Sequence, residues 1–212
     1  LNDVFTRRGE GWVELPLEKH VRFIDYRGRT PTKTTDGMRL ITAKNVKKGV
    51  LMLEPQEFVD PLIYDSWMSR GIPIRGDVLF TTEAPLGNVA QLDTDEKVAF
   101  AQRIIILQPD RTVLNCSYLK YLLLSKKLQA EILEKGTGAT AKGIKSKILR
   151  KIMICFPAIQ HQELLAEKLD EVAIQTDQLT TVYQQKLNAL HELKQSILQK
   201  AFTGQLTDHL PL

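Results

Sequence analysis

The last quarter of the chain is a long stretch that lacks helix-breaking residues. After Pro157 there is no glycine before Gly204 and no proline before Pro211, and the residues between are rich in Leu, Gln, Glu, Lys and Ala. Because proline and glycine interrupt helices most strongly, this composition predicts one helix over residues 160–203. At 1.5 Å per residue the helix is about 65 Å long, which exceeds the thickness of a small domain.

An apolar stripe follows one side of this predicted helix. With Leu169 at heptad position a, eight of the eleven a and d positions are apolar, namely Leu165, Leu169, Val172, Leu179, Tyr183, Leu190, Leu193 and Ile197. One small body cannot cover a stripe of this length. We therefore expect these eight residues to form a dimerisation surface against a second long helix, from another copy of the chain or from another part of a larger protein.

Residues 1–157 show a different pattern, in which short apolar and β-branched stretches are separated by glycines and prolines. This pattern predicts strands at Val21–Ile24, Arg39–Thr42, Val78–Thr82, Asn88–Leu92, Val98–Leu107 and Ile152–Phe156. One helix is expected to interrupt the strands, with Asn115 or Ser117 as its N-cap and Gly136 at its end. The predicted fold class is α+β, with a sheet-containing domain at 1–157 and a helical region at 158–212.

The charge is divided unevenly between these two regions. Residues 1–157 hold 25 Lys and Arg against 18 Asp and Glu, whereas residues 158–212 hold four against seven. A basic body indicates an anionic partner for that region, and the competing interpretation is an ordinary solvated surface. We also expect no membrane span, because no apolar run approaches 18 residues. The only two cysteines, Cys116 and Cys155, favour reduced thiols in the cytoplasm.

Sequence signatures of catalytic sites are missing. The four histidines are scattered without metal-ligand spacing, and the glycine-rich segment Gly136–Gly143 is followed by Ile144 where a phosphate-binding loop needs Lys. There is no Asn-Pro-Pro-aromatic loop of an adenine methyltransferase, and Asp95-Glu96-Lys97 fits a charged turn better than a nuclease site. We therefore expect a protein that binds a partner without catalysis and without a metal or cofactor of its own.

Several basic segments are suited to nucleic acid. Residues 135–157 hold six Lys and Arg and no acidic residue, next to glycines whose backbone N–H groups could meet phosphates. Other clusters pair basic residues with side chains that can read base edges. The candidate DNA-binding residues are Arg27, Arg29, Lys33, Lys44, Asn45, Thr82, Glu83, Lys142, Lys145 and Lys147.

Seven segments together resemble the specificity subunits of type I restriction-modification enzymes. They follow one another in order along nearly the whole chain: Gly11-Trp12, Tyr26-Arg27-Gly28-Arg29-Thr30-Pro31, Leu40–Val46, Gly76–Val89, Gly136–Thr140, Pro157–Asp170 and Leu193–Gly204. The resemblance implies a DNA target recognition domain at 1–157 and a conserved long helix at 158–212, which acts as spacer and dimerisation region and forms an antiparallel coiled coil with a partner helix.

The resemblance also implies partners. Members of this family usually hold two such units, and each unit reads one half of a bipartite target in double-stranded DNA. Methylation and cleavage belong to separate methyltransferase (modification) and restriction/translocase subunits, on which S-adenosylmethionine, ATP and Mg²⁺ are expected. This sequence holds one unit, so it is either a fragment or a half-subunit that pairs with a copy of itself as a homodimer.

Two other function classes stay open at this point. The chain could be a coiled-coil protein-protein interaction module with a basic body that does not read DNA sequence. It could also be a stand-alone nuclease or methyltransferase whose catalytic residues do not form a known motif.

Overall fold

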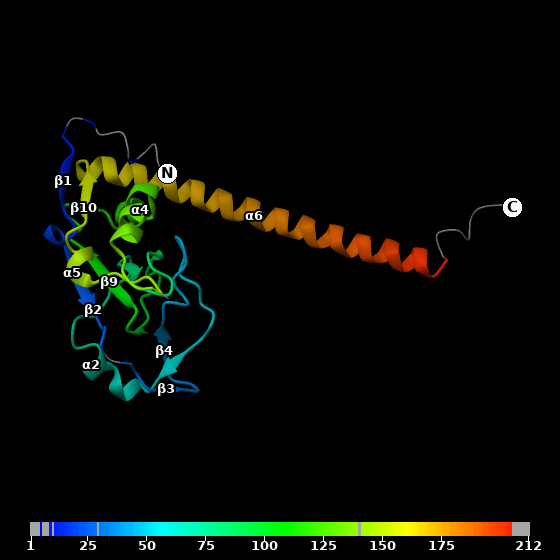
Figure 1. The fold of residues 1–212 in the computed structure, drawn as a ribbon, viewed down its shortest axis with the longest axis horizontal. Helices are drawn as coiled ribbons and strands as arrows, with labels where there is room; N and C mark the ends of the chain where they lie inside the picture. The colour runs from blue at the N-terminus through cyan, green and yellow to red at the C-terminus, as the bar shows by residue number, and fades with distance from the viewer. Residues whose placement is uncertain (1–4, 6–8, 10, 29, 140, 205–212) are drawn as a thin grey trace. The chain divides into compact units, whose positions relative to one another are not determined.

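The computed structural model describes residues 5, 9, 11–28, 30–139 and 141–204 of the 212-residue chain. The chain divides into two compact units, Leu1–Glu167 and Lys168–Leu212. The first unit contains all of the described strands and the second is helical (Figure 1). The predicted fold class, α+β with a long C-terminal helix, is therefore confirmed. The functional boundary at Pro157 stays a prediction.

Three sheets form the first unit. The largest is antiparallel, in the order β2 (Val21–Asp25), β9 (Ile104–Pro109), β6 (Val78–Thr81) and β7 (Val89–Gln91). A second sheet has the order β3 (Lys33–Thr34), β5 (Phe58–Val59), β4 (Met38–Ile41) and β8 (Ala99–Phe100), in which β4 and β8 are parallel. The third sheet pairs β1 (Val13–Pro16) with β10 (Met153–Phe156).

The two four-stranded sheets share one hydrophobic core. Ile24, Leu79 and Ile106 come from the first sheet, and Leu40, Ile41 and Phe100 come from the second; all six are buried. The short helix α2 (Tyr64–Trp67) adds Trp67, whose indole Nε1 donates a hydrogen bond to the carbonyl oxygen of Phe100 at 3.0 Å. Burial of this many apolar side chains holds the sheets together, since burial of each one contributes about 1.5–3 kcal/mol.

Two predicted elements are each divided in the structure. The helix expected between Asn115 and Gly136 is two helices, α3 (Cys116–Leu124) and α4 (Lys126–Lys135), because Ser125 between them is extended and its side chain caps α4. The strand expected over Val98–Leu107 is β8 and β9, separated by a turn at 101–103. Strands β1, β3 and β5, the 3₁₀ helices η1 (Leu17–Lys19) and η2 (Pro61–Ile63), and the short helix α5 (Ser146–Leu149) were not predicted.

The long helix α6 spans Ile159–Phe202, which agrees closely with the predicted 160–203. Its residues from Glu171 onward are all exposed. Of the eight predicted dimerisation residues, Leu165 and Leu169 are half-buried, and Val172, Leu179, Tyr183, Leu190, Leu193 and Ile197 are exposed. Among the described residues no helix is long and apolar enough to cross a membrane.

The start of α6 is attached to the sheet domain by one buried amide. Gln162 is fully buried; its Oε1 accepts from the backbone N–H of Asn115 at 2.9 Å, and its Nε2 donates to the carbonyl oxygens of Val113 at 2.9 Å and Pro157 at 2.8 Å. The backbone of the α3 N-terminus and that of the turn before α6 are therefore joined through a single side chain. Nothing in the sequence pattern indicated this role.

We predict that Gln162→Ala destabilises the chain, because three backbone groups lose their partner and a buried polar group left unpaired costs about 1–3 kcal/mol. The expected loss is about 3 kcal/mol of unfolding free energy. It is measured by chemical denaturation, followed through a spectroscopic signal of the first unit. Gln160→Ala, at an exposed position two residues earlier, is the matched control and should change stability little. Equal stability of the two variants would contradict the role of Gln162.

Candidate nucleic-acid interface

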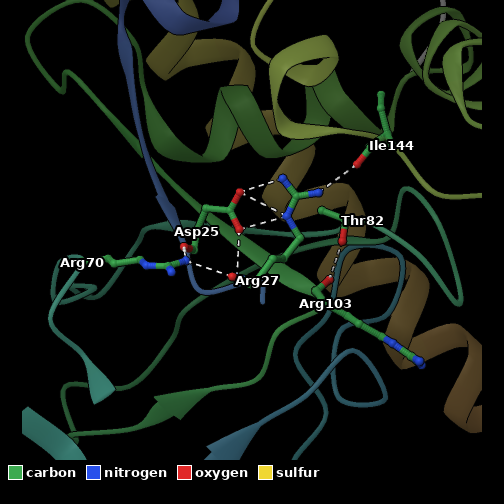
Figure 2. Close-up of polar contacts among 6 residues, drawn as sticks. All are labelled: Asp25, Arg27, Arg70, Thr82, Arg103 and Ile144. Carbon is green, nitrogen blue, oxygen red and sulfur yellow. Dashed lines mark hydrogen bonds and ion pairs between the residues drawn. The ribbon is translucent and has the colours of Figure 1, made fainter. Parts of the chain in front are cut away.

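The central strand β9 brings three separate chain segments to one edge of the largest sheet. It runs antiparallel to both neighbours, with Ile105 opposite Asp25 of β2 and Ile104 opposite Thr81 of β6. The C-terminal ends of β2 and β6 therefore lie beside the start of β9. Arg27, Thr82 and Arg103, which flank these strand ends, come together there (Figure 2).

Arg27 is held rigidly at this edge. Its Nε and Nη2 donate to the carboxylate of Asp25 at 2.9 and 2.7 Å, and its Nη1 donates to the carbonyl oxygen of Ile144 at 3.2 Å (Figure 2). Arg70 donates to the carbonyl oxygens of Asp25 and Arg27 from the other side. The guanidinium of Arg27 is thus fixed by paired, charge-assisted hydrogen bonds and still about one-third exposed.

The glycine-rich loop before α5 closes over the same edge. The N–H of Ile144 donates to the carbonyl oxygen of Thr82 at 2.9 Å, and Thr137 and Gly143 exchange two backbone hydrogen bonds at 2.9 and 2.8 Å. A Cβ at Gly143 would lie 3.3 Å from both the Cβ of Glu83 and the carbonyl oxygen of Thr82. The loop can approach the strand end this closely because position 143 has no side chain.

These contacts leave an open polar hollow of about 350 Å³ at the surface. It is lined by Arg27, Gly28, Thr82, Glu83, Gln102, Thr137, Ala141, Gly143, Ile144 and Lys145. Four of the predicted DNA-binding residues, Arg27, Thr82, Glu83 and Lys145, thus belong to one site. Thr82 is buried and its hydroxyl donates to the carbonyl oxygen of Arg103 at 3.3 Å.

Glu83 and Arg103 form an exposed ion pair at this hollow. The Nε of Arg103 lies 3.0 Å from Oε1 of Glu83, and the two side chains are about half exposed. Sequence reasoning missed Arg103 because it lies inside the stretch that was expected to be one continuous strand. Its position in the turn between two strands presents a guanidinium next to a carboxylate, where both can exchange partners with a ligand.

The pKa of Asp25 is shifted by its surroundings. Partial burial acts to raise the pKa of this carboxyl, but the hydrogen bonds and charge of Arg27, together with a hydrogen bond from Ser146, outweigh the burial and lower the pKa below 3.8. Asp25 is therefore ionised throughout the physiological pH range. The ion pair that orients Arg27 persists under the same conditions.

A second carboxylate, Glu57, joins two of the predicted lysines. Its oxygens lie 2.7 Å from Nζ of Lys33 and 3.2 Å from Nζ of Lys44. Burial acts to raise the pKa of Glu57, but the two lysines outweigh it and lower the pKa. Lys33 and Lys44, which belong to separate basic segments of the sequence, thus lie together. With Glu57 they carry one net positive charge.

The remaining predicted residues lie in different environments. Asn45 is buried: its Oδ1 accepts from the N–H and hydroxyl of Thr42, and its Nδ2 donates to the carbonyl oxygens of Met52 and Pro55. Its amide therefore stabilises its own loop and is not presented to a ligand, which corrects the expectation of a base-reading side chain. Lys142 and Lys147 are exposed, and Arg29 lies outside the described residues.

No cluster of three or more potential metal ligands occurs among the described residues. Cys116 and Cys155 are half-buried and form no disulfide in the described part of the chain. Burial raises the pKa of the Cys116 thiol above its usual value, so this group is poorly suited to act as a thiolate nucleophile.

Comparison with known proteins identifies the family. A family model described as the type I restriction modification DNA specificity domain matches residues 70–189, more than half of the chain. The chain therefore belongs to this family. Among curated proteins it is 23% identical over 172 residues to the EcoBI specificity subunit of Escherichia coli, covering 81% of this chain and 36% of that protein. It is 25% identical over 207 residues to the EcoKI specificity subunit of E. coli K12, covering 94% and 44%. The chain thus spans less than half the length of these relatives.

Solved structures show the same fold. A chain from a study of the assembly and conformational transition of the type I R-M system superposes with a TM-score of 0.69 at 20% identity, covering 94% of this chain and 49% of that one. The HsdS subunit from Thermoanaerobacter tengcongensis superposes with a TM-score of 0.60 at 20% identity, covering 95% and 48%. In both cases this chain corresponds to about half of the larger one.

We predict that Asp25→Asn destabilises the sheet domain by about 1–2 kcal/mol at neutral pH, because the charge-assisted bonds to Arg27 are weakened. The folded-state pKa of Asp25 lies below its usual value, so this stability is present above that value and is lost as pH falls through the folded pKa. The gap between wild type and Asp25→Asn in denaturation midpoint should therefore narrow below pH 3.8. Asp36→Asn, an exposed carboxyl, serves as control; a pH-independent gap would refute the assignment.

Proposed function

We propose that this chain is a DNA target recognition unit of a type I restriction-modification system. The observation that carries the proposal is the convergence of Arg27, Glu83 and Lys145 on one polar hollow, from segments far separated in sequence, with Arg103 paired to Glu83. This convergence occurs in a chain that belongs to the specificity-domain family. In the proposed function the hollow and its basic surroundings contact double-stranded DNA, and the chain reads one half of a bipartite target.

The residues of the hollow offer two kinds of contact. Lys145 supplies positive charge for phosphate oxygens, which positions the protein on the duplex without selecting sequence. Arg27, whose charge is paired with Asp25, offers its remaining N–H donors to the same oxygens. Arg103 and Glu83 supply a guanidinium that suits the O6 and N7 acceptors of guanine and a carboxylate that suits the N4 donor of cytosine. Thr82 supports the site through its backbone contact to Ile144.

Further lysines extend the basic surface. Lys33 and Lys44 share the carboxylate of Glu57, which leaves one uncompensated positive charge for phosphate. Lys142 and Lys147 are exposed in the loop and helix that border the hollow. In this proposal Lys33, Lys44, Lys142 and Lys147, together with Arg29, contact phosphates. Asn45 does not contact DNA.

The chain acts in this proposal as a non-catalytic subunit. Its partners are modification subunits that methylate adenine, with S-adenosylmethionine, and a restriction subunit that uses ATP and Mg²⁺. The exposed apolar stripe of α6 pairs with the same helix of a second copy, or with a second unit of a longer subunit. This pairing supplies the other half of a bipartite reader, since the chain spans less than half of its curated relatives.

The exposed stripe of α6 also favours a second candidate, a coiled-coil interaction module whose basic body does not read DNA sequence. An electrophoretic mobility assay in the presence of the methyltransferase subunit separates the two functions. Site-selective retardation, at a motif found by mapping methylated bases in host DNA, supports the first function; retardation without any sequence preference supports the second.

We predict that Lys145→Ala weakens binding to all DNA sequences to a similar extent, because the lost contact is to a phosphate. The slope of log affinity against log salt concentration should fall in magnitude by about one. Fluorescence anisotropy with a specific and a random duplex measures both effects. Lys97→Ala removes a lysine that does not line the hollow, and it should leave the slope unchanged. An unchanged slope in Lys145→Ala would exclude this contact.

We predict that Leu190→Asp abolishes self-association, because a carboxylate cannot be buried in an apolar seam without a partner. Sedimentation velocity should show a dimer for the wild-type chain and a monomer for the variant, with the circular dichroism of the sheet domain retained. Gln185→Asp introduces the same charge on the same helix outside the a and d positions, and it should remain a dimer. A dimer in Leu190→Asp would contradict the heptad assignment.

A further inference from the structure

The two halves of α6 carry opposite charge. Residues 159–180 contain one lysine and five acidic residues, whereas residues 181–202 contain three lysines and one acidic residue. A parallel pair would place acidic half beside acidic half, which is unfavourable. An antiparallel pair of two copies places each acidic half beside a basic half. The charge distribution of this chain therefore agrees with the antiparallel orientation that the family resemblance implies.

The apolar stripe contains polar interruptions that select one alignment. In the middle of the stripe the a and d residues are apolar except for Thr176 at a and Lys186 at d. A further lysine, Lys200, occupies the last d position. In an antiparallel pair an a residue faces a d residue of the other helix, so the allowed alignments differ in steps of one heptad.

Full overlap of the two helices gives one matched alignment. In it Leu165 faces Ile197, Leu169 faces Leu193, Val172 faces Leu190 and Leu179 faces Tyr183 of the second copy. The two polar residues face each other, Thr176 opposite Lys186. All five layers are therefore matched in polarity, and each occurs twice because the pair is symmetric.

The alignments one heptad away are mismatched. A shift in one direction places Lys186 opposite Leu169, and the other places Lys186 opposite Tyr183 and Thr176 opposite Leu193. Each mismatch buries a lysine against an apolar side chain, which costs free energy unless the charge reaches water. The hydroxyl of Thr176 donates to the carbonyl oxygen of Val172 at 2.7 Å, so its lone pairs are left to accept from a lysine.

A hollow at the start of α6 agrees with the same alignment. Leu164 and Leu165, with Trp12 and Pro157, line an apolar hollow of about 420 Å³. Full overlap brings Ile197 of the second copy opposite Leu165, which lines this hollow. An apolar side chain from the second copy thus meets apolar surface of the first copy.

Taking the antiparallel pairing as given, we propose that its register is fixed by the polar layer between Thr176 of one copy and Lys186 of the other. The inference rests on the self-association in the proposed function and deepens it by naming the alignment. Polar residues in the seam of a coiled coil reduce its stability and fix its register. The spacing of the two recognition units is then set by the position of this layer.

Disulfide trapping in the full-length chain tests the register. Thr176→Cys and Lys186→Cys chains are mixed, oxidised and digested, and cross-linked peptides are identified by mass spectrometry, which separates them from any involving Cys116 or Cys155. The 176–186 cross-link should form several-fold more than two controls. The first control is the 176–179 pair, from Thr176→Cys mixed with Leu179→Cys, which reports a shift of one heptad. The second is the 176–176 pair, which reports a parallel dimer.

The outcomes separate the register from self-association. A dimer in sedimentation that yields mainly 176–179 or 176–176 cross-links, or none of the three, overturns the register and leaves self-association standing. A monomer overturns both, while DNA binding by the sheet domain is tested independently.

A second variant tests the polar layer itself. Thr176→Leu combined with Lys186→Leu should raise the stability of the dimer, because an apolar layer replaces a polar one. The same change should abolish the preference for a single cross-link at other seam positions. That preference is measured by comparing Val172→Cys mixed with Leu190→Cys against Val172→Cys mixed with Tyr183→Cys. An unaltered preference would show that the polar layer does not fix the register.

Discussion

The pairing of β9 with β2 on one side and β6 on the other is the interaction on which the candidate site depends. All four residues Ile104–Leu107 are buried, so the strand is anchored in the core by the hydrophobic effect. Since its two neighbours run in the opposite direction, their ends and its beginning lie at one edge. Residues separated by tens of positions in the sequence thereby share a surface. The chemistry of the hollow is a consequence of strand direction.

Most of the basic residues named at this surface are paired with acidic side chains. Arg27 is neutralised and oriented by Asp25, Arg103 is paired with Glu83, and Lys33 and Lys44 share Glu57. An oriented guanidinium loses less freedom when it meets a ligand than a mobile one does. The acidic partners also weaken attraction to arbitrary polyanions, so discrimination depends on geometry as much as on net charge.

Much of the architecture could be predicted from the sequence, and the failures have physical causes. The long helix follows from the absence of proline and glycine after Pro157, and its ends agree within one residue at each end. The division of Val98–Leu107 could not be seen, because the turn at 101–103 contains no glycine or proline. Arg103 was hidden for that reason. Asn45 was misjudged because a buried amide and a base-reading amide look alike in a sequence, and only its four contacts reveal which it is.

Two backbone hydrogen bonds between Thr137 and Gly143 close a short loop. The end of this loop is held beside the residue that follows β6 by the hydrogen bond from the N–H of Ile144 to the carbonyl oxygen of Thr82. Gly138 has a positive φ, and a Cβ there would clash with the carbonyl oxygen of Ala141. Changes in the length of this loop should disturb the sheet beneath little, because loop length costs little free energy once the base is fixed. New binding preferences could therefore arise from a few substitutions in this loop while the sheet beneath it stays the same.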